Sequence, residues 1–310
     1  MQQDEIRTLA SSILLLLGEH IVGFSFLSKG STSHVWMIRS NLNTYALRVI
    51  DADERVISGT IDSFIRNEIT NRGGKTARPV LHSEMPNSVS DKKRWTLDEY
   101  VAGSHPEHGN LPLEVCRELG KTLAALHDIP VSQFGRPVKI SNSAILGEKL
   151  NSLRGVMQRF ENPIPETWET GFVHPVIAMK PNMASNILIQ LQYVSDTLKE
   201  NNHVLCHSDL HSRQLLCTGD KLNALIDFGD AMILDRNWDL GSALYFHGMD
   251  NFREIYNSYV GCSQIGGHDL GVAKSFSVAV AMHHASRSRL PGKGHRLERA
   301  VSHIIEIMDS

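Results

Sequence analysis

The sequence predicts an α+β protein of two lobes, an N-terminal lobe built on an antiparallel sheet and a larger, mainly helical C-terminal lobe. Short β-rich runs separated by turns dominate residues 24–101, whereas longer runs with the helical spacing of apolar residues dominate residues 112–308. A short segment containing glycine, serine and proline at 102–106 separates the two parts. We therefore expect one lobe over residues 1–102 and another over residues 103–310, with a ligand site at their junction.

The N-terminal lobe is expected to hold two helices and several strands. The first helix covers residues 4–18, and its apolar stretch Ile13–Leu17 is far too short to cross a bilayer. In the second helix, residues 57–72, isoleucine recurs at positions 57, 61, 65 and 69, and two glycines end the run. The strands are expected at 24–28, 34–39, 45–50, 79–82 and 95–101, the first three as an antiparallel meander.

The C-terminal lobe is expected to begin with an amphipathic helix over residues 112–128, in which leucine recurs at positions 119, 123 and 126. A small β-rich region is expected between Val204 and Asp227, with a turn at residues 218–220. Further helical stretches are expected around 143–160, 180–200, 268–289 and 294–308.

Composition and charge narrow the class of function. The 310 residues are 41% hydrophobic and 21% charged, which is ordinary for a globular protein. The formal net charge is -3 and no block of lysine and arginine stands out, so we expect no nucleic-acid partner. The four cysteines form no C-x-x-C pair, which favours buried thiols in a reducing compartment. These features predict a cytoplasmic monomer or homodimer without membrane contact.

The residues that could carry chemistry gather between Val204 and Asp230. A polar loop holds Asp209, Gln214 stands shortly after it, and a later strand ends at Asp227. Phosphoryl transfer needs such groups, because one carboxylate takes the proton of the attacking hydroxyl and another holds a magnesium ion against the phosphate oxygens. A hairpin between the loop and Asp227 would bring both carboxylates to one end of paired strands.

This segment resembles the catalytic motifs of the aminoglycoside phosphotransferase family, which shares its fold with choline kinases and protein kinases. The family pattern H-x-D-x-x-x-x-N is matched by His207-Ser-Asp-Leu-His-Ser-Arg-Gln214, and the second motif by Ile226-Asp-Phe-Gly229. The resemblance implies a bilobal protein-kinase-like fold and an enzyme that transfers the γ-phosphate of ATP or GTP to a hydroxyl. It makes Asp209 the catalytic base, and Gln214 and Asp227 the ligands of Mg²⁺. Gln214 stands where the family has asparagine.

The resemblance continues in the N-terminal lobe, where it implies a nucleotide site. Gly30 and Ser31 fall in a loop that is similar to the family's short nucleotide loop, so both are expected to contact the nucleotide. Arg48, on the third expected strand, takes the place of the family's basic residue that binds the α- and β-phosphates. Glu68 lies on the following helix, where the partner carboxylate of that basic residue is expected.

Two further parts of the resemblance concern the hinge and the support of the loop. The segment before the helical lobe is similar to the family's hinge, which implies that the backbone of Glu99 and Val101 contacts the adenine edge. Asp239 lies in a run that is similar to the family's G-D-P-x-x-D-L-A element, and is expected to brace the polar loop. The matching segments run in the same order from about residue 24 to residue 245.

The expected acceptor is a small molecule with a hydroxyl group. Residues 45–49 and 134–135 resemble hygromycin-type antibiotic kinases, so an aminoglycoside or related antibiotic, a cationic acceptor, is the first expectation, with antibiotic resistance as the role. A kinase of an amino alcohol or a sugar is the second interpretation. Because Gln214 departs from the family pattern, a catalytically degenerate nucleotide-binding module is the third.

A metallohydrolase is an interpretation of a different class. His207, Asp209 and His211 alternate, and alternate residues of an extended segment can share a zinc ion. Such a site needs a further ligand from elsewhere in the chain, and no other histidine stands at a recognisable spacing.

Overall fold

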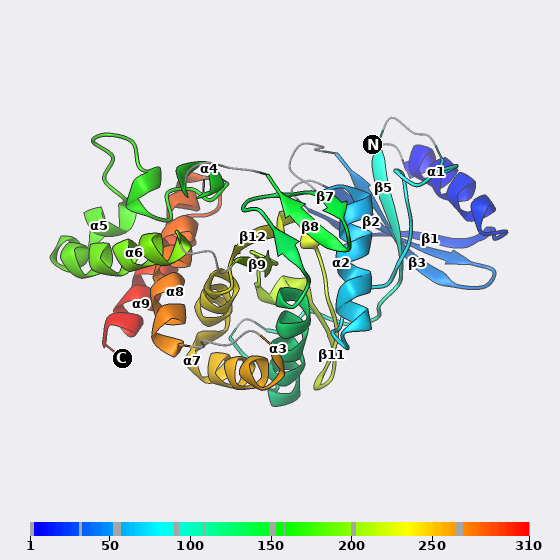
Figure 1. Ribbon diagram of the computed structural model, residues 1–310. Helices are drawn as coiled ribbons and strands as arrows, with labels where there is room; N and C mark the ends of the chain where they lie inside the picture. Colours follow the sequence, from blue (N-terminus) through cyan, green and yellow to red (C-terminus); the bar gives the residue numbers. More distant parts are fainter. Residues whose placement is uncertain are drawn as a thin grey trace.

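The computed structural model of the protein describes residues 3–30, 33–51, 57–89, 93–107, 109–148, 153–157, 159–199, 203–264 and 269–309. Two lobes stand beside each other, with the antiparallel sheet of the N-terminal part on one side and a larger, mainly helical part on the other (Figure 1). The α+β arrangement of two lobes that the sequence predicts is confirmed.

A five-stranded antiparallel sheet with the strand order β1-β2-β3-β5-β4 forms the N-terminal lobe. Its strands are β1 (Ile21–Lys29), β2 (Ser33–Ser40), β3 (Thr44–Ile50), β4 (Pro79–His82) and β5 (Arg94–Glu99). Helix α1 (Gln3–Leu16) packs on the sheet, where Ile13 shares a hydrophobic core with Trp36. The register places Arg48 of β3 opposite Thr96 of β5, which fixes where the Arg48 side chain leaves the sheet.

Helix α2 (Gly59–Asn71) joins the two lobes. Ser58 caps its start by accepting the Ile61 N–H at 3.2 Å, which satisfies one of the amide groups left open at a helix N-terminus. The buried Ile61, Ile65 and Ile69 belong to the hydrophobic core of the C-terminal lobe and not to the core beneath α1. The packing of α2 therefore crosses the boundary expected at residue 102, and that boundary stays a prediction.

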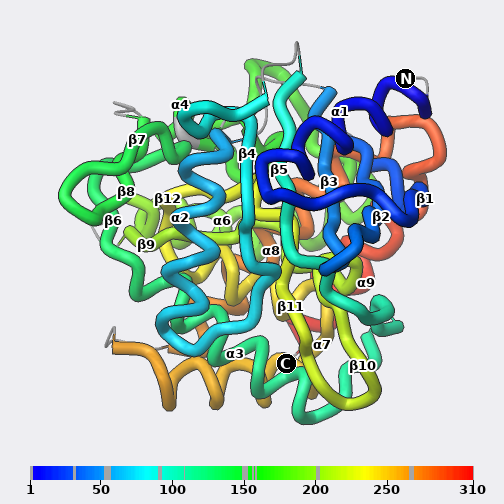
Figure 2. Tube along the Cα trace, turned by 90° about the vertical axis from the view of Figure 1, so that its right-hand side faces the viewer, coloured from blue at the N-terminus to red at the C-terminus, as the bar shows by residue number. Residues whose placement is uncertain are grey.

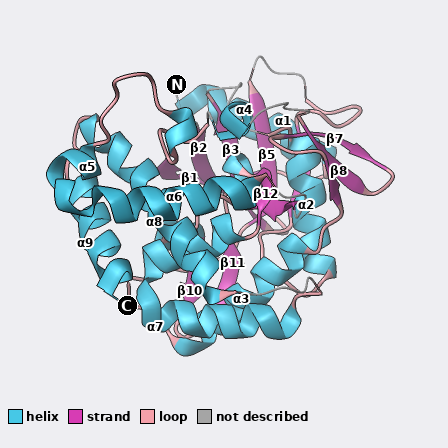
Figure 3. Cartoon of the chain, turned by 60° about the vertical axis from the view of Figure 1, so that its left-hand side comes forward, coloured by secondary structure: helices cyan, strands magenta, loops and turns pink. Residues whose placement is uncertain are grey.

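The C-terminal lobe is a group of helices packed around α7 and α8 (Figure 3). Its helices are α3 (Leu113–His127), α4 (Leu153–Met157), α5 (Pro175–Met179), α6 (Ala184–Leu198), α7 (Asn237–Cys262), α8 (Leu270–Ser286) and α9 (His295–Asp309). Leu123 of α3, Phe252 of α7 and Phe276 of α8 are fully buried in one continuous core. Among the described helices, none has both the length and the apolar character that crossing a bilayer requires.

Short strands complete the C-terminal lobe and carry the polar loop. They are β6 (Val131–Ser132), β7 (Pro137–Ser141), β8 (Ala144–Gly147), β9 (His203–Cys206), β10 (Leu215–Thr218), β11 (Lys221–Leu225) and β12 (Met232–Asp235). β9 pairs with β12, and β10 forms an antiparallel hairpin with β11 that extends away from the sheet strands (Figure 2). The strand, loop and hairpin pattern expected between residues 204 and 227 is confirmed.

The prediction of a helix around residues 143–160 is wrong for residues 143–148. β7 and β8 form a hairpin around Asn142 and Ser143, which have φ angles of 50° and 61°. Two consecutive residues with positive φ form the turn that best matches the twist of paired strands, and asparagine adopts this conformation readily. Of the described residues in the expected helical range, those of α4 are helical and those of β8 form a strand.

The sequence analysis also missed α7, a helix of 26 residues. Its first part, from Asn237 to His247, is buried on all sides, so it shows no alternation of apolar and polar faces. Gly248, with φ 77° and ψ 169°, then interrupts the helical conformation and breaks the phase of any pattern. Because of the burial on all sides and the interruption at Gly248, the spacing of apolar residues does not reveal this helix, although it is central to the lobe.

Gly241 of α7 lies so close to α8 that a methyl group there would stand 2.6 Å from the Ser277 backbone nitrogen. We expect Gly241→Ala to destabilise the protein by about 1–3 kcal/mol, because the two helices would have to move apart. In the same helix, a methyl group on Gly261 would meet nothing within 4 Å. Gly261→Ala should leave stability unchanged or raise it by up to about 1 kcal/mol, through the helix propensity of alanine. Denaturant unfolding measures both, and equal stabilities would contradict the close packing.

Candidate active site

The polar loop, residues 207–214, lies between β9 and β10 and is held against the segment that follows β11. The chain leaves β9 at Cys206 and ends the loop in a short 3-10 helix, Ser212–Gln214. The Ile226 N–H donates to the Gln214 carbonyl at 2.9 Å, and the His207 ring Nε2 lies 2.9 Å from the Ile226 carbonyl oxygen. These two contacts place Asp227, the residue after Ile226, beside the loop.

Asp239, near the start of α7, supports the loop from behind. Its fully buried carboxylate accepts the N–H of His207 at 2.7 Å and the N–H of Ser208 at 2.8 Å, one with each oxygen. The His127 ring Nε2 also lies 3.2 Å from it. Ser208 has a φ of 71°, a conformation that serine rarely adopts and that these hydrogen bonds hold in place. The expected bracing role of Asp239 is confirmed.

Asp209 lies half-buried within the loop, between two polar side chains. His211 Nε2 lies 3.3 Å from Asp209 Oδ2, and the Gln214 amide donates to the same oxygen at 3.4 Å. Burial alone would raise the pKa of Asp209, but the hydrogen bond from His211 and the charge of His211 hold that pKa well below its ordinary value. The carboxylate is therefore ionised at neutral pH and able to accept a proton.

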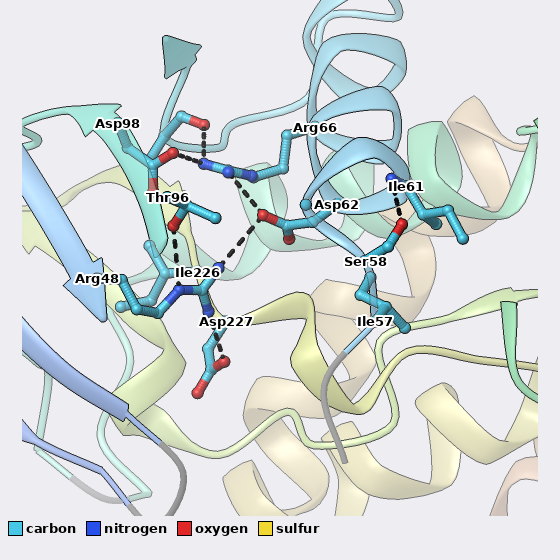
Figure 4. Close-up of polar contacts among 12 residues, drawn as sticks. Arg48, Ile57, Ser58, Ile61, Asp62, Arg66, Thr96, Asp98, Ile226 and Asp227 are labelled. Atoms are coloured by element: carbon cyan, nitrogen blue, oxygen red, sulfur yellow. Dashed lines mark hydrogen bonds and ion pairs between the residues drawn. The ribbon is translucent and has the colours of Figure 1, made fainter. Parts of the chain in front are cut away.

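Asp227 presents its carboxylate toward the junction of the lobes (Figure 4). Its backbone is left-handed, with φ 65° and ψ 66°, and its side chain is 55% exposed. Arg48 Nη1, from β3 of the N-terminal lobe, lies 3.1 Å from Asp227 Oδ1. Aspartate tolerates the left-handed region better than most residues, so this turn can point a carboxylate out of the strand.

Arg48 is the centre of a polar network between the sheet and α2 (Figure 4). Besides Asp227, it donates to Asp62 of α2 at 3.2 Å and to the Thr96 hydroxyl at 3.4 Å. Asp62 in turn accepts from Arg66 at 2.6 Å, and Arg66 contacts Asp98 of β5 at 2.7 Å. Burial raises the pKa of Asp98, although Arg66 and Arg48 oppose that shift. Two arginines and two aspartates thus alternate in a buried layer.

The expectation that Glu68 is the partner carboxylate of Arg48 is wrong. Glu68 forms an ion pair with Arg72 on the same helix, and Asp62 occupies the position beside Arg48. Residues six apart in a helix are rotated by about 240° around its axis, so Asp62 and Glu68 face different directions. Asp62 stands one turn before Arg66, a spacing that could have indicated their buried ion pair. The sequence alone, however, does not tell which face of α2 meets the sheet.

The residues expected to contact the nucleotide come from two parts of the N-terminal lobe, the start of the β1–β2 connection and the end of β5. The Gly30 N–H donates to the Ser33 carbonyl at 2.8 Å and closes the turn between β1 and β2. Ser31 falls outside the described residues. The Glu99 N–H donates to the Arg78 carbonyl at 2.9 Å, whereas the Val101 N–H meets no acceptor in the described part of the chain. A backbone N–H without an acceptor among the described residues, such as that of Val101, could donate to the edge of an adenine ring. The roles of Gly30, Ser31, Glu99 and Val101 in nucleotide binding stay predictions.

The structure does not support a zinc site in the polar loop. Both ring nitrogens of His207 have partners, Nε2 at the Ile226 carbonyl and Nδ1 at the Asp209 N–H, 3.3 Å away. Within the described ranges, the group of side chains with metal-ligand spacing is a different one: His127, Cys206 and Asp239. That group is buried and already engaged in the bracing of the loop, which gives it a structural explanation.

Comparison with protein-family models gives a match to the phosphotransferase enzyme family over residues 25–261. The chain belongs to this family. The predicted enzyme class, a phosphotransferase, is confirmed, and so is the resemblance to the aminoglycoside phosphotransferases. No curated protein sequence matches the chain significantly.

Solved structures of aminoglycoside phosphotransferases are similar along almost the whole chain. A thermostable mutant of APH(4)-Ia in a ternary complex with AMP-PNP and hygromycin B has a TM-score of 0.65 at 14% identity, with 98% of each chain covered. ADP-bound APH(2'')-Ib has a TM-score of 0.57 at 14% identity, covering 99% of this chain and 98% of that one. Spectinomycin phosphotransferase APH(9)-Ia, with ADP and spectinomycin, has 0.53 at 15%, covering 100% and 95%. This likeness confirms the predicted kinase-like fold.

Removing the charge of Asp62 and removing that of Glu68, the two acids of α2, should change the stability of the protein by different amounts. Asp62→Asn removes a carboxylate shared by Arg48 and Arg66, and we expect the free energy of unfolding to fall by about 3 kcal/mol, because two buried guanidinium groups lose compensating charge. Glu68→Gln removes a partly exposed pair within the helix and should cost about 0.5 kcal/mol or less. Chemical denaturation compares the variants. A larger loss for Glu68→Gln would restore Glu68 as the important acid.

Proposed function

We propose that this phosphotransferase transfers the γ-phosphate of ATP, or of GTP, to a hydroxyl group of a small molecule, with Asp209 as the catalytic base. One observation carries the proposal: Asp209 and Asp227, from the segment between β9 and β12, converge with Arg48 of the distant strand β3 at the junction of the lobes. Asp227 is joined to the loop of Asp209 through the Ile226 backbone and to Arg48 at 3.1 Å. Phosphoryl transfer depends on positioning and charge stabilisation, which such a convergence supplies.

The N-terminal lobe binds the nucleotide in this proposal. Arg48 offers a planar guanidinium that can contact phosphate oxygens while it stays anchored to Asp62 and Thr96. Gly30 and Ser31 are proposed to contact the nucleotide as well, and the backbone of Glu99 and Val101 would contact adenine. Bound ADP or AMP-PNP in the similar phosphotransferase structures supports a nucleotide triphosphate as co-substrate.

Two residues fit a magnesium ion. Asp227 offers a carboxylate that is more than half exposed, and Gln214 offers an amide whose nitrogen already faces Asp209. Both supply the oxygen donors that Mg²⁺ prefers. When bound, the ion would neutralise negative charge on the phosphate oxygens. Arg48, which pairs with Asp227 from the other lobe, would hold the ligand in position.

Asp209 acts on the acceptor hydroxyl. Its ionised carboxylate takes the hydroxyl proton as the oxygen attacks the γ-phosphorus, and the bond from that phosphorus to the bridging β-phosphate oxygen breaks, so that the nucleoside diphosphate leaves. His211 and Gln214 both contact Oδ2, which leaves Oδ1 as the oxygen for the substrate proton. Asp239 fixes the backbone that carries this side chain, and thereby limits the distance over which the base can drift.

Several classes of small molecule are candidates for the acceptor. An aminoglycoside is one candidate, because similar structures are complexes with hygromycin B and spectinomycin. An amino alcohol or a sugar is another. Release of ADP across a panel of such acceptors decides among them. The degenerate-module alternative predicts nucleotide binding without any acceptor-dependent ADP release.

We expect Asp209→Asn to lower turnover by about two to four powers of ten, because the amide cannot accept the hydroxyl proton. Nucleotide affinity should stay close to that of the wild type, since Asp209 does not contact Arg48 or the hinge. Asp220→Asn in the exposed turn between β10 and β11 is the matched control and should keep full activity. Acceptor-dependent ADP release measures turnover. Equal turnover of Asp209→Asn and wild type would remove Asp209 from the mechanism.

The effect of Gln214 on the metal requirement is a further prediction. A magnesium ligand must bring its oxygen to about 2.1 Å, and the side chain of asparagine is one methylene shorter than that of glutamine. We expect Gln214→Asn to lower activity or raise the Mg²⁺ requirement, and Gln214→Ala to do so more strongly. Titration of Mg²⁺ against turnover compares the three proteins. A clear gain of activity in Gln214→Asn would instead indicate a weakly active, degenerate site.

A further inference from the structure

A line of aromatic and basic side chains runs from Asp209 to the last two helices of the C-terminal lobe. His211, which contacts Asp209, packs edge-on against Phe246 with ring centroids 5.7 Å apart. Phe246 packs in the same way against His284 of α8, at 5.0 Å. His284 Nδ1 then lies 3.5 Å from Nη1 of Arg296. Arg296, in the first turn of α9, is thereby linked to Asp209 by four successive contacts through three intervening side chains.

Arg296 is a cation without a counter-ion. Its side chain is half-buried, and no carboxylate in the described part of the chain lies within ion-pairing distance of it. Arg287 and Arg289, which precede α9, both contact Glu161, at 3.9 and 3.0 Å. Among these three arginines, Arg296 is therefore the one whose charge is available to a bound anion.

The surroundings add positive charge and little negative charge. Burial lowers the pKa of Arg296, and Arg287 acts in the same direction, against Asp209 and Glu161. Burial also lowers the pKa of His284 well below its ordinary value, so its imidazole is neutral at pH 7 and accepts the guanidinium N–H. An anion beside Arg296 would therefore be stabilised by a partly buried guanidinium that nothing else neutralises.

A structural role explains Arg296 poorly. A cation in the first turn of a helix is unfavourable for the helix dipole, so Arg296 does not stabilise α9 by its charge. Arg299, one turn later, provides a contrast, because its guanidinium donates to the Tyr245 carbonyl at 3.0 Å and lies 4.7 Å from the Tyr245 ring centroid. Arg299 fastens α9 to α7, whereas the only side-chain partner of Arg296 among the described residues is the neutral His284.

Two acids of the region are also engaged and would offer little to a positively charged acceptor. Glu161 is shared by Arg287 and Arg289, and Asp230, which follows the predicted metal ligand, is paired with Arg159. An amino group placed here would meet arginines whose acids are already taken. An acidic group would meet Arg296.

We propose that the acceptor of this phosphotransferase carries an anionic group, a carboxylate or a phosphate, near the hydroxyl that is phosphorylated, and that Arg296 binds this group. The inference rests on the proposed function, and it replaces a cationic acceptor by an acidic one. Arg296 is a specificity residue: it selects the acceptor by charge and has no part in the transfer of the proton or the phosphoryl group.

The direct test measures anion binding without turnover. The protein is saturated with Mg²⁺ and AMP-PNP to fill the nucleotide site, and inorganic phosphate or acetate is then titrated by calorimetry. We expect at least one of the two anions to bind, and Arg296→Gln to weaken that binding about tenfold or more, the usual size of a lost charge-assisted contact. Comparing phosphate with acetate shows which acidic group the site prefers.

Two further variants separate charge from folding. Arg296→Lys keeps the positive charge and should retain most of the binding. Arg253→Gln, on the exposed surface of α7, makes the same chemical change at an arginine that pairs only with Asp250 in the described structure. It should bind the anion as the wild type does.

Turnover with matched acceptors gives the second measurement. Glucose, glucosamine, glucuronate and glucose 6-phosphate share ring hydroxyls and differ in charge. We expect an anionic member to have the highest kcat/KM, and Arg296→Gln to abolish its advantage through KM with little change for glucose. The inference is overturned if wild type and Arg296→Gln bind both anions equally or not at all, or if glucosamine or an aminoglycoside is the preferred acceptor. Absence of turnover with every acceptor, together with Arg296-dependent anion binding, would count against the proposed function alone.

Discussion

The guanidinium of Arg48 is the group on which the junction of the two lobes depends. It contacts Asp62 on α2, Thr96 on β5 and Asp227 in the C-terminal lobe, and each partner comes from a separate segment. Arginine suits this position because its planar fork of donors can serve several acceptors at once. Without it, the exposed carboxylate of Asp227 would lose the one ion pair that ties it to the sheet, and Asp62 would depend on Arg66 alone.

The polar loop is supported by a different kind of interaction. Asp239 holds it by accepting backbone N–H groups, so the path of the loop does not depend on which side chains it carries. Arg48 acts between side chains of the two lobes. In the proposed function, the base would therefore lie on a fixed support, whereas the side proposed to bind phosphate would be held by ion pairs that can exchange partners. This division suits a reaction in which one reactant must be positioned and the other must come and go.

The sequence predicted those parts of the fold and site that rest on local order along the chain. The polar loop, the hairpin behind it and the two aspartates stand within one short segment, so their spacing was enough to bring them together. Asp62 was missed because the buried face of α2 is decided by the sheet and the C-terminal core together. Helix α7 was missed because burial on all sides removes the periodicity that marks a helix. Arg296 is connected to Asp209 through His284 of α8, and so through the packing of α9 on α8, which no local sequence pattern records.

The divided packing of α2 has a mechanical consequence. Its isoleucines are embedded in the C-terminal core, while Asp62 and Arg66 on its other side meet the sheet through ion pairs. A rotation of one lobe against the other would leave the apolar contacts of α2 intact and slide the sheet along the polar layer. Apolar packing resists sliding because it opens voids, whereas a layer of charges can pass its hydrogen bonds from one partner to the next. Such a movement would therefore separate α2 from β3, and the chain crosses that boundary twice, before and after α2, within the N-terminal lobe.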